Sequence, residues 1–215
     1  VYITYKVLDF ADLTVDGSLA TGGAVAVMCM LNGANTYVAL ILAFLAGMLA
    51  GLVTGLFHTA LGIPPILAGI LTQLGLYSIN MRIMGKANQA ISVMQYDVLV
   101  SLRYIPHACL LTTGFCIVII ALLYWFFGTE IGASVRATGC NPNMARAQGI
   151  NTNATKVLGL VISNGLVGLA GALYAQYQGS ADINMGRGAI VIGLAAVIIG
   201  EVVFGKIFHN FALHM

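Results

Sequence analysis

The feature that most constrains this chain is a series of apolar stretches that contain no Asp, Glu, Lys or Arg. These stretches are Ser18–Leu31, Tyr37–Phe57, Leu61–Met81, Ile105–Phe127, Val157–Gln176 and Ala189–Gly200. A helix needs about 20 apolar residues to cross a bilayer, and several of these stretches have that length. Because backbone groups in lipid must be hydrogen-bonded within the spanning segment, the pattern predicts an all-α, polytopic transmembrane helical bundle.

Composition agrees with a chain that is surrounded by membrane lipid. Hydrophobic residues make up 60% of the sequence and charged residues 7%, with a mean hydropathy of +0.95. A soluble domain has roughly 25% charged residues, so this chain has too few to cover a surface facing water. The formal net charge is only +2, and since no basic run occurs, the sequence favours no nucleic-acid partner.

Two apolar stretches have features of short or broken helices. Ser18–Leu31 is shorter than an ordinary span and contains Gly22 and Gly23. We therefore expect a short or re-entrant helix there, at membrane depth. Leu61–Met81 has Pro64 and Pro65 near its start, where proline is tolerated in a helix.

Small residues recur at every third or fourth position on several of these helices. The stripe on Tyr37–Phe57 consists of Ala39, Ala43, Gly47, Gly51 and Gly55. Similar stripes are Gly165, Gly168, Ala172 and Ala175, and then Ala189, Gly193, Ala196 and Gly200. Such stripes let helix backbones approach closely in a membrane, so each predicts a helix–helix contact.

Motifs for catalysis, metal binding or nucleotide binding do not occur. The sequence has no GxxxxGK[ST] phosphate loop, no HExxH and no GxSxG, so we expect no catalytic residue, metal site, cofactor or ATP site of its own. An intramembrane hydrolase would need a serine beside a histidine, such as Ser78 or Ser163 with His107, and nothing in their spacing supports this alternative. A passive channel is a further alternative.

Polar residues lie inside or at the ends of the apolar stretches: Asp12, Asp16, Gln73, Asn80, Asn164 and Glu201. An ionisable residue at membrane depth is a candidate functional residue. The alternative for Asp12 and Asp16 is that they cap the start of the helix after them. Asn164 and Gln73 either form interhelical hydrogen bonds or line a path, and Glu201 either has a role of its own or marks the membrane edge.

Charge does not determine the orientation in the membrane. If the polar segment Thr129–Lys156 is cytoplasmic, the segment Arg82–Tyr104 is outside. The inside then holds Lys6, Arg136, Arg146, Lys156 and Lys206, and the outside holds Arg82, Lys86, Arg103 and Arg187. Because these sets are nearly equal, the positive-inside rule leaves the topology open.

The segment Thr129–Lys156 also carries a motif. It reads approximately R-A-x-G-x-N-P-x-x-A-x-x-x-G-I-N and ends with a lysine before the next apolar stretch, in the residues Arg136, Ala137, Gly139, Asn141, Pro142, Ala145, Gly149, Ile150, Asn151 and Lys156. This resembles the signature cytoplasmic loop of the permease subunits of ABC importers for branched-chain amino acids, ribose and related solutes. Asp12–Ser18 resembles the "DLSVG" entry to that family's short second helix, and Tyr177–Gly200 resembles the segment that follows its glycine-rich helix.

The resemblance covers nearly the whole chain. It implies that residues 1–215 form a single permease transmembrane domain that lacks the family's first helix and C-terminal helices. The most similar subgroup is that of tryptophan/tyrosine-type permeases. The implied function is transport in a bacterial cell membrane, with amino acids as the preferred solute and a ribose-type sugar as the alternative. The implied partners are ABC ATPase subunits, a second permease copy or paralogue, and an extracytoplasmic solute-binding protein.

The family's loop couples the membrane helices to the ATPase, which implies a coupling helix within residues 129–156 here. Asn141 suits the N-cap, Pro142 the first turn and Gly149 the end of such a helix. We expect Arg146 to pair with an acidic groove on the ATPase; the alternative is an ordinary capped connecting helix. The implied coupling residues are Arg136, Gly139, Asn141, Pro142, Ala145, Arg146, Gly149, Ile150 and Asn151. Candidates for the translocation path are Asp16, Gln73 and Asn164.

Overall fold

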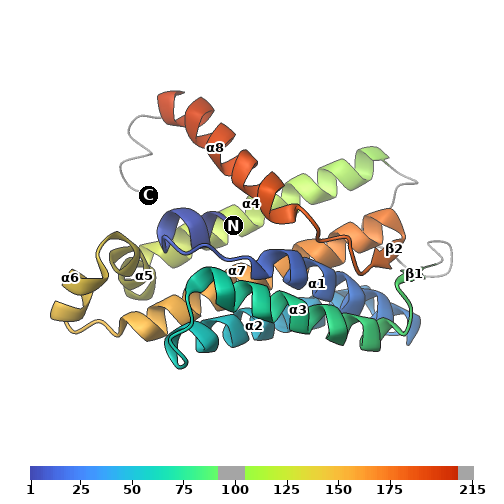
Figure 1. The fold of residues 1–215 in the computed structure, drawn as a ribbon. Coiled ribbons are helices and arrows are strands. Elements are labelled where there is room, and N and C mark those ends of the chain that lie inside the picture. The colour runs from blue at the N-terminus through green and yellow to red at the C-terminus, as the bar shows by residue number, and fades with distance from the viewer. Residues whose placement is uncertain (92–104, 208–215) are drawn as a thin grey trace.

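The computed structural model describes residues 1–91 and 105–207, without the side chains of 105–108 and 204–207. In these residues the prediction of an all-α bundle is confirmed (Figure 1). The helices long and apolar enough to cross a membrane are α1 (Thr14–Leu31), α2 (Thr36–Thr59), α3 (Pro65–Met84), α4 (Ile105–Gly128) and α7 (Thr152–Gln178). In α4 the candidate span is the part from Cys109 to Gly128. The structure does not describe Arg103, and it does not describe the side chains of His107 and Lys206.

The first membrane helix is longer than its apolar stretch. The short or re-entrant helix expected at Ser18–Leu31 starts before that stretch, because α1 begins at Thr14 and has 18 residues, enough to be a candidate membrane span. Asp16 therefore lies in its first turn rather than before it. The helix begins near the middle of the bundle's long axis (Figure 1), so its polar N-terminus lies among the other helices.

The predicted contacts between glycine stripes are confirmed for α2 and α7. A side chain added at Gly47 or Gly51 would collide with backbone carbonyl oxygens of α7, at Asn164 and Leu160. On α7, a Cβ added at Gly168 would lie 2.7 Å from the carbonyl oxygen of Ala43. These helices therefore touch backbone to backbone, which larger residues would prevent.

The third stripe does not form such a contact within the described residues. It lies on α8 (Ala189–Ile207), which projects away from the bundle (Figure 1). A side chain added at Gly200 would meet none of the described atoms within 4 Å, and one at Gly193 would meet only Val1. Within the described residues, the helix–helix contact predicted for this stripe is therefore not found at Gly193 or Gly200, and α8 lies against α1 only near its start. A salt bridge of 2.6 Å between Lys6 Nζ and Glu201 Oε1 joins α8 to the π-helical turn η1 (Ile3–Val7).

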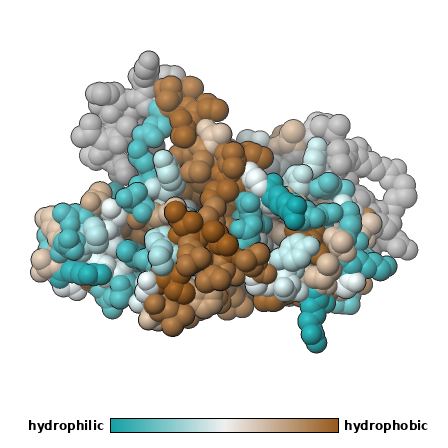
Figure 2. Space-filling model, viewed as in Figure 1, coloured by the Kyte–Doolittle hydropathy of each residue, from teal (hydrophilic) through white to brown (hydrophobic). Residues whose placement is uncertain are grey.

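Polar structure gathers at the two ends of the bundle. At one end, the segment predicted as a loop is largely helical, with α5 (Glu130–Cys140) and α6 (Pro142–Ala147). At the opposite end, β1 (Asn88–Ala90) pairs antiparallel with β2 (Ser180–Asp182), Gln89 lying opposite Ala181. Figure 2 shows an apolar band across the middle with hydrophilic residues on both sides, as expected when the long axis crosses a bilayer.

Candidate functional site in the membrane helices and the loop helix

A hydrogen-bonded network of buried polar side chains lies between α1 and α7. Asn164 is 0% exposed; its Nδ2 donates to Asp12 Oδ2 at 2.7 Å, and its Oδ1 accepts from Ser18 Oγ at 2.6 Å. Asp12 Oδ1 also accepts from the backbone N–H of Thr14 at 3.0 Å. Asp12 thus caps the start of α1, as expected of one of the two predicted capping residues, and Asn164 forms interhelical hydrogen bonds.

A second buried network joins three helices through threonine hydroxyls. Thr14 Oγ1 lies 2.7 Å from Thr54 Oγ1, which donates to Thr72 Oγ1 at 3.0 Å. Thr54 and Thr72 lie on α2 and α3, so these hydroxyls connect both helices to the first turn of α1. Since hydroxyls in a low-dielectric interior need partners, the network fixes how these three helices pack.

Asp16 caps a helix, but not the one in which it lies. Its Oδ2 accepts from the backbone N–H of Gly188 at 3.1 Å and its Oδ1 from that of Ile190 at 3.0 Å. The prediction that Asp16 caps the helix that follows it is therefore wrong. Its carboxylate instead binds the N-terminus of α8, where unpaired N–H groups and the helix dipole favour a negative charge. Asp16 is separated from Gly188 by 172 positions in the sequence and from Ile190 by 174.

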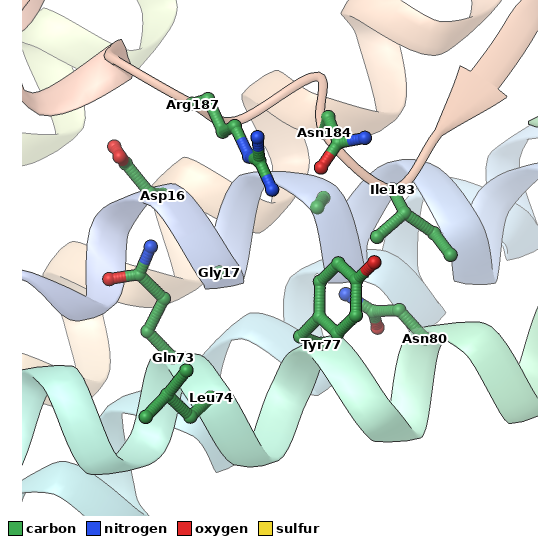
Figure 3. A pocket seen from close by; sticks show the side chains of 10 residues that line it. Asp16, Gly17, Gln73, Leu74, Tyr77, Asn80, Ile183, Asn184 and Arg187 are labelled. Atoms are coloured by element: carbon green, nitrogen blue, oxygen red, sulfur yellow. The ribbon is translucent and has the colours of Figure 1, made fainter. Parts of the chain in front are cut away.

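A polar cavity of about 120 Å³ opens between α1, α3 and the connection from β2 to α8. Figure 3 shows the labelled side chains around it, with Arg187 directed from the connection toward α1 and α3. The polar residues that line it are Asp16, Gln73, Tyr77, Asn80, Asn184 and Arg187. Two of the three residues predicted for the path, Asp16 and Gln73, thus line one cavity, whereas Asn164 lies in the buried network instead.

Sequence reasoning missed three of these residues, namely Tyr77, Asn184 and Arg187. Asn184 and Arg187 lie on a connection between secondary-structure elements, where polar residues are ordinary. Tyr77 stands on an apolar helix, where an aromatic residue most often contacts lipid or a neighbouring helix. One feature of the sequence could have indicated Tyr77: it lies between Gln73 and Asn80, two polar residues two turns apart on the same helix.

Asn80 is the most buried of the polar residues that line the cavity. It is 1% exposed, and its Oδ1 has no hydrogen-bond partner among the described residues. A buried amide oxygen without a partner costs roughly 1–3 kcal/mol, so its presence needs an explanation. Two other residues, Ser163 and Gln176, also have buried polar atoms without a described partner, but they do not line this cavity.

The predicted helix in the polar segment is present, and it is capped as predicted. Asn141 Oδ1 accepts from the backbone N–H groups of Asn143 and Met144, both at 3.1 Å. Pro142 occupies the first turn, and Gly149 has a φ of +84°, which favours glycine. Asn151 caps α7 in the same way, with its Oδ1 accepting from Asn153 and Ala154, both at 3.2 Å. The backbone of this segment is therefore fixed by its own side chains.

The motif residues of this segment differ in what they contact. Arg146 is exposed, and its Nε donates to Thr152 Oγ1 at 2.8 Å. Ala145 is 2% exposed and packs inside the chain. A side chain added at Gly139 would collide with the carbonyl oxygen of Val7, so Gly139 allows η1 to approach α5. Arg136 lines an apolar cavity of about 430 Å³ between η1, α4 and α5.

The serine–histidine pair that a hydrolase would need is not tested by the described residues. Ser163 is 2% exposed and lies on α7, whereas the side chain of His107 is outside the described residues. Among the described residues, no group of three or more His, Cys, Asp or Glu side chains is placed to hold a metal ion.

Comparison with known proteins gives a consistent result. The family model described as branched-chain amino acid transport system / permease component matches residues 1–213. The chain is 43% identical to the tyrosine transport system permease protein of Clostridioides difficile, over 96% of this chain and 68% of that protein. It is 37% identical to the uncharacterized protein RP368 of Rickettsia prowazekii, over 98% and 74%.

A more distant relative has a different solute in its name. The autoinducer 2 import system permease protein LsrC of Yersinia pseudotuberculosis is 29% identical, over 86% of this chain and 53% of that protein. No solved structure matches the chain.

Proposed function

Because the chain belongs to the family of branched-chain amino acid transport system permease components, we propose that it forms the translocation path for an amino acid in an ATP-driven importer. The chain is a permease subunit and a multi-pass protein of the bacterial cell membrane, with five candidate membrane spans among its described residues. The preference for an amino acid rests on one observation, the 43% identity to a tyrosine transport system permease across 96% of this chain. The 29% identity to an autoinducer 2 import system permease shows that similar permeases differ in solute. The ribose-type sugar that the motif resemblance implies is the second candidate.

An ATP-driven importer needs ATPase subunits, a solute-binding protein and a second permease subunit besides this chain. Its sequence has no phosphate loop, so separate ABC ATPase subunits supply the energy and this chain breaks no bond itself. An extracytoplasmic binding protein delivers the solute, and a second permease copy or a paralogue completes the path. Asp16 and Gln73 border that path at the cavity, while Asn164 holds α7 to α1 beside it.

The loop helix α6 is the proposed contact with the ATPase. It lies at one end of the molecule (Figure 1), its N-cap is Asn141, and the next helix, α7, is capped by Asn151. Exposed Met144 (58%) and exposed Arg146 give it an apolar and a cationic contact for a groove. Asn141, Gly149 and Ala145 serve this contact indirectly by fixing the shape of the helix.

The contact is tested by reversing one charge. Arg146→Glu should lower the amount of ATPase subunit that copurifies with the membrane-inserted permease by about tenfold, because an acidic groove would then face a like charge. The matched control is Lys86→Glu, an exposed charge reversal beside β1 at the other end of the molecule. Normal copurification with Arg146→Glu would reject the assignment of α6.

The solute is tested by uptake into proteoliposomes that contain the permease, the ATPase subunits and the cognate binding protein. We expect ATP-dependent accumulation of radiolabelled L-tyrosine or another amino acid, and none of D-ribose. Accumulation of ribose alone would favour the second candidate. Uptake of equal rate without ATP would indicate a passive channel and contradict both.

A further inference from the structure

The cavity that Asp16 and Arg187 share contains groups of both charges that are not paired with each other. Among the described residues the one salt bridge is that of Lys6 with Glu201, so Asp16 and Arg187 are not within ion-pair distance. The guanidinium of Arg187 makes no hydrogen bond with the described part of the chain. The carboxylate of Asp16 binds two backbone N–H groups, and each of its oxygens has a further lone pair to offer.

Asn80 supplies a second, independent indication of a ligand. Its amide oxygen is buried and without a partner, and the residue lines the same cavity (Figure 3). An acceptor that is 99% removed from solvent is costly unless something donates to it, since Asn80 is 1% exposed. An ammonium group carries three donors, one of which would satisfy the amide oxygen of Asn80.

The size of the cavity limits which part of a solute fits. Its volume is about 120 Å³, which equals the space of about four water molecules in the liquid. That is enough for an ammonium, an α-carbon and a carboxylate, but not for a large side chain as well. Tyr77 is 44% exposed at the edge of the cavity and offers a ring face to a side chain that extends outward.

We propose that this cavity is a subsite of the permease for the zwitterionic head of the transported amino acid. The guanidinium of Arg187 holds the carboxylate in a forked, charge-assisted contact, and Asn80 accepts a hydrogen bond from the ammonium. Asp16 fixes the first turn of α8 beside Arg187 through the N–H groups of Gly188 and Ile190. The inference rests on the proposed function and adds to it the chemical groups that the permease itself recognises.

The subsite lies beside the first turn of α8, so a bound ligand would be in contact with the residues that hold this helix in place. Asp16 connects the cavity to the first turn of α8 through Gly188 and Ile190. Arg187 precedes that turn directly, so the carboxylate-binding group and the helix move together. Broken helices that meet at a solute site in this way are a recurrent arrangement in transporters.

The test measures L-tyrosine uptake in proteoliposomes with the complete importer. Arg187→Gln should lower the initial rate by about tenfold or more, the usual range for losing a charged hydrogen bond. Arg187→Lys should restore part of that rate, because it keeps the charge without the forked geometry. The matched control is Arg82→Gln, an exposed arginine on α3 that does not line the cavity and should stay within about twofold of the wild type.

Two further measurements separate recognition from folding. The amount of Arg187→Gln permease in the membrane and its copurification with the ATPase subunits should equal those of the wild type. Asn80→Leu, which changes the cavity wall formed by α3, should also lower the initial rate of uptake. Normal uptake by Arg187→Gln, or an equal loss in Arg82→Gln, would overturn the subsite while leaving amino-acid import intact. Joint loss of uptake and of copurification with the ATPase subunits would overturn it in favour of a structural role. A wild type that imports no amino acid would overturn both the subsite and the proposed function.

Discussion

At the scale of single residues, the two aspartates near the start of α1 have different partners. Asp12 is 2% exposed and binds Asn164 of α7, whereas Asp16 is half-buried and binds the backbone of α8. Both carboxylates therefore hold α1 to helices that follow more than 100 positions later, at separations of 152 and 172 residues. In a low-dielectric bundle, such hydrogen bonds specify which helices pack together.

The first prediction concerns Asn164. Asn164→Leu keeps the volume of the side chain but removes the hydrogen bonds to Asp12 and Ser18. We expect the free energy of unfolding to fall by about 1–3 kcal/mol, because a buried carboxylate loses its side-chain partner. Thermal unfolding of the purified permease in detergent measures this.

The control for this variant lies on the same helix. Asn153→Leu changes an exposed residue of the first turn of α7, so its melting temperature should remain close to that of the wild type. If Asn164→Leu were as stable as this control, the buried network would have no structural role.

At the scale of elements, the contact between α2 and α7 depends on glycines. Gly51 of α2 lies against the carbonyl oxygen of Leu160, with the side chain of Asn164 at 3.0 Å from an added carbon atom. Neither backbone can move aside without separating the helices. The helices consequently tolerate no side chain at this position, although alanine favours helix formation elsewhere.

The second prediction compares two glycine-to-alanine changes. Gly51→Ala should destabilise the permease by about 1–3 kcal/mol, since the methyl group has no room. Gly75→Ala, on α3, places its methyl group in open space within the described residues, and should raise stability slightly through helix propensity. The two melting temperatures in the same detergent measure the difference, and equal values would contradict the packing described.

Another element, α6, depends on its cap. Asn141→Ala removes the acceptor for the N–H groups of Asn143 and Met144, which costs about 0.5–2 kcal/mol of helix stability. Because α6 is the proposed contact with the ATPase, we expect weaker copurification of that subunit with an unchanged amount of permease in the membrane. Replacement by Asp, another N-cap residue, should retain normal copurification; a defect as large as that of alanine would count against capping as the cause.

At the scale of the whole molecule, the polar ends and the apolar band predict an orientation. The end with α5 and α6 lies opposite the end with β1 and β2 (Figure 1), and apolar residues lie between them (Figure 2). If α6 binds a cytoplasmic ATPase, the strands face the outside. The nearly balanced charges of the sequence left this open, but the position of α6 resolves it once its function is assumed.

The orientation prediction is tested by labelling introduced cysteines. In a variant without native cysteines, a membrane-impermeant maleimide applied to intact cells should label Lys86→Cys and not Met144→Cys. Inside-out vesicles should give the reverse result. Both native positions are exposed, so accessibility to solvent does not favour either one. Labelling of Met144→Cys in intact cells would exclude a cytoplasmic α6.

The sequence by itself determined the membrane bundle, the stretches that became α2, α3 and α7, and the capped helix at Pro142. Each of these depends on local chemistry: runs of apolar residues, proline at a helix start, and an asparagine cap followed by a glycine with positive φ. The tertiary structure alone decided which long-range partner each polar residue has. Asp16 looked like the cap of its own helix and proved to cap α8, because the chain returns to α1 only after β2.

The same reason explains the cavity. Asp16, Asn80 and Arg187 belong to three segments that no local pattern connects, so their shared cavity follows only from the packing of α1 against α3 and from the path of the connection before α8. Hydropathy identified residues that lie in the membrane, since burial in lipid acts on each residue separately. The pairing of charges and hydrogen bonds depends on distances across the fold, and only the folded chain sets those distances.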